Sequence, residues 1–204
     1  MSGSDPQGRW VASSIEEKDI TKLREVGYLT ADIHHRLPAP GQVIPTLEPN
    51  ECVVFVPHFL RGLGFTLHPF VRGLMFYYGL DFHDLAPDAI IHISSFIIVC
   101  EAFLHVTPHF DLWPKTFNVK PQMIEGRHVE CGGAVISRNS NASWPEGSFP
   151  EVSNVWQWRW FYVTPPRGTK WVAAPEFRSG PPSQLASWTD VGWNWGPAGD
   201  VAEL

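Results

Sequence analysis

Two arginines occupy matching positions in a repeated apolar motif. The pattern Phe-x-Arg-Gly-Leu-x-Phe occurs as FLRGLGF and again as FVRGLMF, and it contains Arg61 and Arg72. Two guanidinium groups held side by side could bind a phosphate or a carboxylate. A charged side chain in an aromatic stretch is more often paired inside the fold, here with an acid such as Glu101 or Asp111. We favour this structural role and keep both arginines as candidate interaction residues.

The densest aromatic stretch of the chain is WQWRWFYV. In an extended strand Trp156, Trp158 and Trp160 would share one face, and Arg159 would lie on the opposite one. Such a row could stack nucleic-acid bases. However, the chain has 15 Lys and Arg against 21 Asp and Glu, a formal net charge of −6, which does not attract a polyanion. We therefore expect the tryptophans to cover a core, and nucleic-acid binding is an alternative that the charge does not favour.

One set of thiol and imidazole side chains has the residue types of a metal site. Cys100, His105 and His109 follow one another at short spacing, and Cys131 could complete the set. A structural zinc site usually begins with two closely spaced Cys, which this chain lacks. On a helix, Cys100 and His105 would also point in different directions. We expect no metal at these residues.

Three acids, Asp81, Asp84 and Asp88, could converge on a divalent metal, as strand transfer would require. Their context, LDFHDLAPDA, is typical of a turn followed by a helix start, where acids favour the helix dipole. The chain has no phosphate-binding loop, no dinucleotide-binding glycine motif, no serine-hydrolase elbow and no HExxH motif. We therefore expect no cofactor and favour a non-enzymatic role, with the enzyme question left open.

The composition is that of a folded protein from inside a cell. The 204 residues are 44% hydrophobic, which is enough for one core. Three Cys, an odd number, and a polar N-terminus predict reduced thiols in the nucleus or cytoplasm and no secretion. The longest apolar stretch, residues 89–106, contains His, Ser and Glu, so we expect a buried helix and no membrane span.

Two helices are predicted from their end signals. The first starts at Ser14, with Glu17 three residues later as in a capping box, and stops at Gly27. The second runs from Pro69 to Gly79 and has almost no polar face, which predicts burial on all sides.

A third helix is expected from Pro87 to Val106. Its main apolar arc contains Ala89, Ile90, Ile93, Phe96, Ile97, Cys100, Phe103 and Leu104. Ile91 and Ile98 lie on the opposite arc, among polar residues. This placement predicts a second contact surface.

Strands are expected mainly in the second half of the chain. Residues 131–138 and 155–166 are rich in β-branched and aromatic side chains, which predicts a hairpin or small antiparallel sheet. Residues 52–56 are a shorter run that is either extended or the entry to a short helix. Residues 37–51 carry four Pro, which predicts an extended connector.

A family resemblance follows from longer segments. The segments FTLHPFVRGL, CEAFL and PHFDLW, in that order, resemble the gypsy-type transposon domain of plants, which is also called transposase-like. The segments RWVASSIEEKDITKLREVGYL and WQWRWFYV extend the likeness to roughly residues 10–165. The resemblance implies a plant protein derived from a retrotransposon, with no demonstrated transposase activity.

Together these observations predict one α+β domain, with a mainly helical core and a small antiparallel β-hairpin or sheet near the C-terminus. The domain is expected over residues 9–166, after a disordered N-terminus at residues 1–8. A mostly irregular Pro- and Trp-rich tail is expected at residues 167–204, with its tryptophans as docking groups.

The function favoured by the sequence is a non-enzymatic interaction or assembly module that binds another copy of itself or another protein, and no membrane. The candidate contact residues are Arg61, Arg72, Ile91, Ile98, Trp156, Trp158, Arg159 and Trp160. The alternatives are a nucleic-acid-binding accessory protein and a transposase-like nuclease. The nuclease would need acids that converge on a divalent metal.

Overall fold

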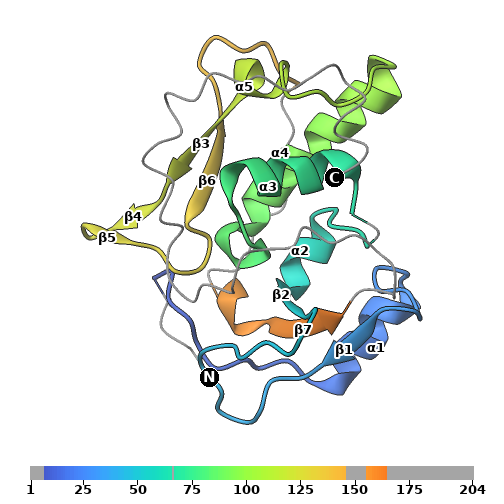
Figure 1. Cartoon of the computed structure of the whole chain (residues 1–204), viewed down its shortest axis with the longest axis vertical. Coiled ribbons are helices and arrows are strands. Elements are labelled where there is room, and N and C mark those ends of the chain that lie inside the picture. The colour runs from blue at the N-terminus through green and yellow to red at the C-terminus, as the bar shows by residue number, and fades with distance from the viewer. Residues whose placement is uncertain (1–6, 66, 146–154, 165–204) are drawn as a thin grey trace.

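A computed structural model describes residues 7–65, 67–145 and 155–164 of the protein, and Figure 1 shows its elements. In chain order these are α1 Glu17–Glu25, β1 His34–Arg36, β2 Cys52–Phe55, α2 Val56–Leu60, α3 Pro69–Tyr78, the 3-10 turn η1 Phe82–Asp84, α4 Pro87–Ile98, the π-helical turn η2 Val99–Phe103, α5 Trp113–Thr116, β3 Phe117–Pro121, β4 Met123–Ile124, β5 Arg127–His128, β6 Ala134–Arg138, the 3-10 turn η3 Trp156–Trp158 and β7 Trp160–Thr164.

A three-stranded antiparallel sheet with the order β1-β7-β2 forms the lower part of the molecule in Figure 1. The last described strand, β7, is therefore the central one. Its register places Trp160 opposite Phe55 and Phe161 opposite Val54. Successive side chains of β7 consequently alternate between the two faces of the sheet.

Each face of this sheet contributes to a different hydrophobic cluster. One cluster contains Val54, Phe161 and Val163 of the sheet, Ile20 and Leu23 of α1, Phe59 of α2, and most buried residues of α3 and α4. The other contains Trp10, Val53, Phe55, Cys131, Trp156, Trp160 and Tyr162. Burying each large apolar side chain contributes roughly 1.5–3 kcal/mol, so both faces of this small sheet stabilise the fold.

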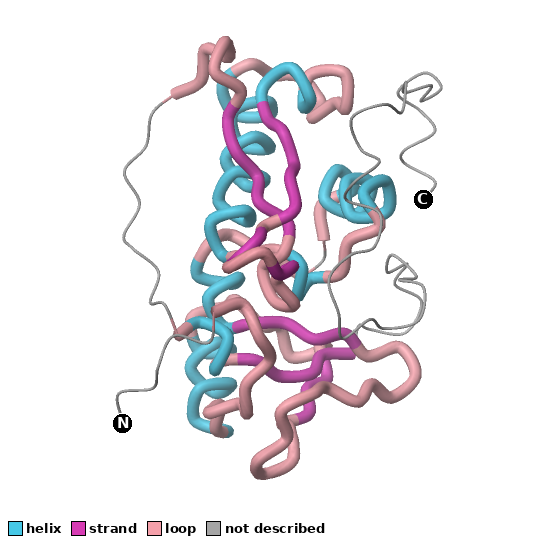
Figure 2. Tube along the Cα trace, turned by 90° about the vertical axis from the view of Figure 1, so that its left-hand side faces the viewer, coloured by secondary structure: helices cyan, strands magenta, loops and turns pink. Residues whose placement is uncertain are grey.

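A second layer consists of α4 and the β3–β6 ribbon, which run alongside each other in Figure 2. Aromatic rings join them: Phe96 of α4 lies 5.2 Å from Trp113, which lies 4.8 Å from Phe117 of β3, between ring centroids. At the lower end of the ribbon, the N–H of Gly132 donates to the carbonyl of His83 at 2.7 Å. The ribbon is thereby attached to η1, and η1 connects it to the rest of the core.

The first predicted helix exists but begins later than expected. Glu16 is the N-cap of α1 and shares a capping box with Asp19. Ser14 has a different role: its backbone N–H donates to the carbonyl of Trp158 at 2.7 Å. The N-cap therefore lies at Glu16, two residues later than the sequence predicted, because Ser14 takes part in a tertiary contact.

The second predicted helix, α3, is confirmed at both ends. Pro69 begins it, and Gly79 ends it in the left-handed conformation with φ 61°. The N–H of Leu80 then donates to the carbonyl of Met75 at 2.8 Å, which is the expected C-terminal closure. Burial on all sides is wrong, because Phe76 is 57% exposed.

The predicted mainly helical core is wrong. The described α-helices are short, from 4 residues in α5 to 12 in α4. Strands occur from His34 to Thr164 in three small sheets and are not confined to the C-terminal part. An α+β description is compatible with this arrangement, but helices do not dominate the core.

The predicted pairing of residues 131–138 with residues 155–166 is also wrong. β6 pairs with β3, whereas β7 pairs with β1 and β2. Residues before Trp160 form the turn η3 and not a strand. The partner strands β1 and β2 are only 3 and 4 residues long, too short for a clear alternation in the sequence.

Two expectations lie partly or wholly outside the described residues. The tail at residues 167–204 is outside them, and so are residues 1–6 of the expected disordered start. Gly8 is described and buried, and its carbonyl accepts from the N–H groups of Glu130 and Cys131. In the described part of the chain, no helix has both the length and the apolar character needed to cross a bilayer.

Candidate functional site

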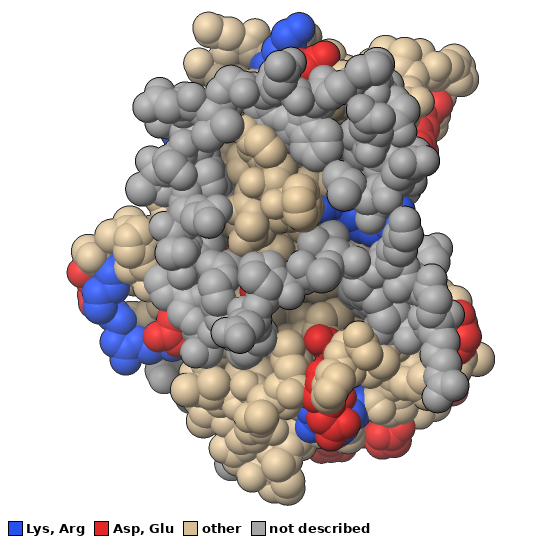
Figure 3. Space-filling model, in the orientation of Figure 1, with Lys and Arg blue, Asp and Glu red and all other residues tan. Residues whose placement is uncertain are grey.

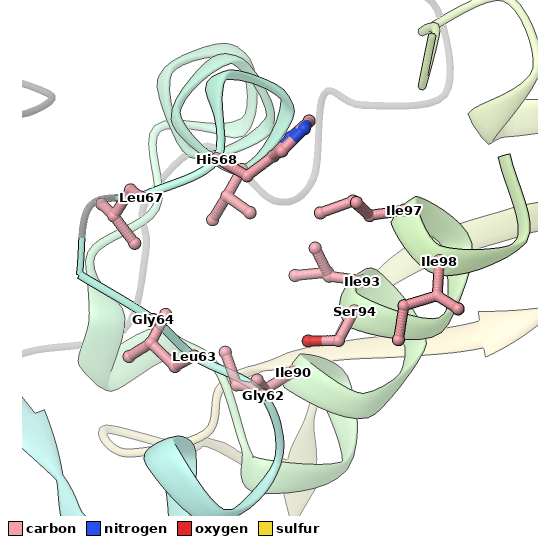
Figure 4. Close-up of a pocket in the computed structure, with 11 residues that line it drawn as sticks. Gly62, Leu63, Gly64, Leu67, His68, Ile90, Ile93, Ser94, Ile97 and Ile98 are labelled. Carbon is pink, nitrogen blue, oxygen red and sulfur yellow. The ribbon is translucent and has the colours of Figure 1, made fainter. Parts of the chain in front are cut away.

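An apolar cleft lies between α4 and the segment that joins α2 to α3 (Figure 4). Its volume is about 250 Å³. The lining is Gly62, Leu63, Gly64, Leu67, His68, Val71, Ile90, Ile93, Ser94, Ile97 and Ile98. Because seven of these side chains are aliphatic, the cleft is built to hold apolar groups.

The close approach of the two walls depends on Gly62. This residue has φ +96°, a conformation that L side chains rarely adopt. A Cβ placed there would lie 2.8 Å from Oγ and 3.0 Å from Cβ of Ser94 on α4. Gly62 therefore lets the backbone approach α4 closely, and the next residue, Leu63, is buried.

One polar contact spans the edge of the cleft. His68 is the N-cap of α3, and its Nδ1 accepts from the N–H of Phe70 at 3.1 Å. Its Nε2 lies 2.9 Å from Oε1 of Glu101, in the turn after α4. Because Nδ1 accepts, Nε2 carries the hydrogen of a neutral ring and donates it to Glu101. This hydrogen bond joins the two walls at one end of the cleft.

Exposed apolar side chains follow the cleft residues in the chain, from Ile98 at the end of α4 to the end of η2. Ile98 is 54% exposed, Phe103 73% and Leu104 54%. Phe103 and Leu104 were expected on the core arc, which is wrong. The π-helical turn η2 explains this: the N–H of Leu104 donates to the carbonyl of Val99, five residues earlier. One extra residue in the turn rotates the following side chains away from the core.

The two arginines of the repeated motif lie beside the cleft in sequence, and both are partly buried. Arg61 is the C-cap of α2 and precedes the lining residue Gly62, and Arg72 follows the lining residue Val71 on α3. Glu101 contacts His68, and Asp111 contacts Nδ1 of His109 at 3.4 Å.

Two of the aromatic candidates, Trp156 and Trp160, belong to the hydrophobic cluster that contains Phe55. Trp156 and Trp160 are buried in the cluster around Phe55, and Trp158 is partly buried. Nη2 of Arg159 lies 2.9 Å from Oδ1 of Asp19, so the guanidinium ties η3 to α1. In this arrangement Trp156 and Trp160 cover a core.

The two isoleucines of the predicted second contact surface lie in different environments. Ile91 is buried, at 7% exposure, whereas Ile98 is exposed and lines the cleft. Of the predicted contact residues, only Ile98 is part of the cleft lining. Arg61 and Arg72 are adjacent in the chain to the lining residues Gly62 and Val71. The cleft residues Leu67, Ile93 and Ser94 were not predicted as site residues. Gly62 was the signal in the sequence that backbone approaches a helix here.

A second polar group is buried at η1. Among the described residues, side chains of Asp81, His83 and Asp84 could supply three metal-ligand atoms within 4.8 Å of one another. Their proximity has a structural cause, because Asp81 and Asp84 form the capping box of η1. His83 Nε2 lies 3.5 Å from Asp84 Oδ1. The bonding of the capping box accounts for this convergence without an ion.

His58 of α2 is another fully buried titratable group. Its Nε2 lies 2.8 Å from the carbonyl oxygen of Leu85, to which a neutral ring donates. Burial lowers the pKa of His58 to about 4, and the contact with Leu85 opposes this effect only in part. The ring is therefore uncharged at neutral pH and serves to connect α2 with the segment after η1.

Charge on the described part of one face is shown in Figure 3. Lys and Arg gather at one edge, over the β4–β5 hairpin, while Asp and Glu are scattered over other parts of this face. Within the hairpin, Nη2 of Arg127 lies 3.8 Å from Oε2 of Glu125, which partly compensates the positive charge. The basic group is small compared with the several phosphate contacts that non-specific nucleic-acid binding uses.

Residues 53–121 match the family described as "Putative gypsy type transposon". The chain is therefore similar to this family over that segment. The match covers about a third of the chain and includes α2, α3, α4 and every residue of the cleft. No curated protein and no solved structure matches the chain significantly.

Proposed function

We propose that this chain is a non-enzymatic interaction module of a plant retrotransposon-derived protein, acting inside the cell, and that its cleft docks an apolar segment of a partner polypeptide. The observation that carries the proposal is the cleft itself, with seven aliphatic side chains and a single hydroxyl, that of Ser94. The transposon-related match over residues 53–121 and the motifs around it support the retrotransposon origin.

A polypeptide fits this cleft better than a small metabolite does. Small-molecule sites are usually 300–1,000 Å³ and contain several convergent polar groups. The volume here is about 250 Å³, room for one or two large side chains, and its lining is almost wholly aliphatic. Exposed apolar residues also follow the cleft residue Ile98 in the chain, Phe103 and Leu104, and such exposed groups are typical of protein-binding surfaces.

Selection of short random peptides against the purified protein tests this proposal. We expect enriched peptides to carry one or two large apolar anchors. Ile98→Glu places a charge on the wall of the cleft at a position that is already 54% exposed, so folding should be retained. Ile44→Glu is a matched control, because Ile44 is 56% exposed and lies outside the cleft lining.

Affinities of the selected peptides for the three proteins decide the outcome. We expect Ile98→Glu to weaken binding by about tenfold or more, and Ile44→Glu to leave it nearly unchanged. Equal affinity for the wild type and Ile98→Glu would place binding elsewhere and overturn the proposal. A DNA and RNA titration at several salt concentrations tests the nucleic-acid alternative, for which a steep salt dependence is the expected signature.

A further inference from the structure

We infer that the cleft has an intramolecular occupant, the tryptophan-rich segment of this same chain at residues 188–195. The segment has the sequence WTDVGWNW, in which Trp188, Trp193 and Trp195 supply three large apolar side chains and Asp190 the only charge. The inference rests on the proposed docking role of the cleft and goes beyond it by naming a competitor for the partner.

The chemistry of the segment fits the lining of the cleft. An indole is flat and mostly apolar, and it buries more apolar surface than any aliphatic side chain. Its N–H needs one hydrogen-bond acceptor when it is buried. The hydroxyl of Ser94 is the side-chain oxygen in the lining, and it points into the cleft in Figure 4. A volume of about 250 Å³ accommodates one indole.

The length of chain after β7 allows the contact. The strand ends at Thr164, so 23 residues separate it from Trp188. A flexible chain of that length spans about 25–30 Å on average, which is comparable with the diameter of a domain of this size. A tether of this kind gives an effective concentration of about 1 mM. Even a weak interaction between an indole and the cleft would then fill the cleft in a substantial fraction of the molecules.

The exposed residues around the cleft supply a further reason. Ile98 on the cleft wall and the nearby chain residues Phe103, Leu104 and Val106 are the largest group of exposed aliphatic and aromatic side chains within one short stretch of the described chain. An apolar surface of this kind is usually covered by a partner. A segment on the same chain reaches it without the translational entropy cost of a separate molecule.

Methyl NMR of the full-length protein with labelled isoleucines tests the inference. An indole above an isoleucine shifts its methyl resonance through the ring current. We expect Trp188→Ala, Trp193→Ala or Trp195→Ala to move the methyl resonances of Ile93, Ile97 and Ile98, and to leave those of Ile20 and Ile136 unchanged. Trp171→Ala is the matched control, because Trp171 lies outside the segment.

Dilution separates the intramolecular contact from one between two copies. Shifts that persist on dilution support the inference. Shifts that disappear on dilution show that a second copy fills the cleft, and they overturn it. The absence of any shift in the three variants, or a shift with Trp171→Ala alone, also overturns it.

The selected peptides provide an independent readout. If the segment occupies the cleft for half of the time, removing the docked tryptophan should strengthen peptide binding about twofold. Peptides that bind wild type and Ile98→Glu equally would refute the docking role of the cleft, whatever the NMR result. Peptides that bind the cleft without any effect of the tryptophan variants would refute only the intramolecular occupant.

Discussion

Replacing Gly62 with alanine should lower the free energy of unfolding by about 2–4 kcal/mol. The positive φ of +96° costs an L residue about 1–2 kcal/mol. The new Cβ would also lie 2.8 Å from Oγ of Ser94, and such overpacking costs about 1–3 kcal/mol. A protein of this size is typically stable by 5–15 kcal/mol, so the variant should still fold.

Urea unfolding followed by tryptophan fluorescence measures the change. Gly64→Ala is the matched control two residues away, because a Cβ at Gly64 has no atom within 4 Å and its φ is outside the left-handed range. We expect Gly64→Ala to change the free energy of unfolding by less than about 0.5 kcal/mol.

A double-mutant cycle separates the two causes. Combining Gly62→Ala with Ser94→Gly removes both atoms that the new Cβ would meet, so the steric part of the loss should be recovered. The conformational part, about 1–2 kcal/mol, should remain. If the changes in unfolding free energy of the two substitutions are additive within about 0.5 kcal/mol, Gly62 does not approach Ser94. The close contact between the two walls of the cleft would then be refuted.

Two further predictions concern buried and paired charges. His58 stays neutral in the folded state down to about pH 4, whereas an unfolded His takes up a proton near pH 6.5, so stability should fall as pH decreases from about 6.5 to 4, by up to about 3 kcal/mol. His58→Gln should lack this component, and an unchanged pH dependence in that variant would contradict the assignment. Arg36 Nε lies 2.8 Å from Oε1 of Glu51, within a two-point contact, so Arg36→Lys should cost about 1–2 kcal/mol in denaturant unfolding. Arg127→Lys, at an exposed pair, should cost almost nothing, and equal losses at both sites would argue against a special contact at Arg36.

Local signals in the sequence predicted helix α3 well because its end residues act within a few positions. Pro69 fixes the first turn and Gly79 adopts the left-handed closing conformation, and neither depends on distant parts of the chain. The same reasoning placed Ser14 incorrectly, because a carbonyl 144 residues away competes for it. Capping residues are therefore predictable where no tertiary contact recruits them.

The partners of β7 could not be predicted from pattern. The alternation of Trp160 and Tyr162 against Phe161 and Val163 is confirmed by their different clusters. The pairing is not local: β1 contains the polar sequence His-His-Arg, which has no strand periodicity. Its position is set by the neighbouring strand, so tertiary structure overrides local propensity here.

The cleft was only partly foreseen for a related reason. Ile98 was predicted as a contact residue because helical periodicity places it away from the main core arc. The opposite wall is a loop with two glycines, and its distance from α4 depends on how two segments pack. Beyond Ile98, the π-helical turn changes the phase of the helix, which regular periodicity does not reveal.

The central position of β7 also determines when the protein can acquire its structure during synthesis. β1 cannot pair until Thr164, the partner of His34, has been synthesised, and β2 cannot pair until Val163, the partner of Cys52, has been synthesised. A ribosome adds roughly 5–20 residues each second, so both edge strands remain without their partner for roughly 5–25 s after they are made. During this interval their unpaired backbone groups are open to association with other nascent chains. The three-stranded sheet of this protein can therefore form only after its last described strand has left the ribosome.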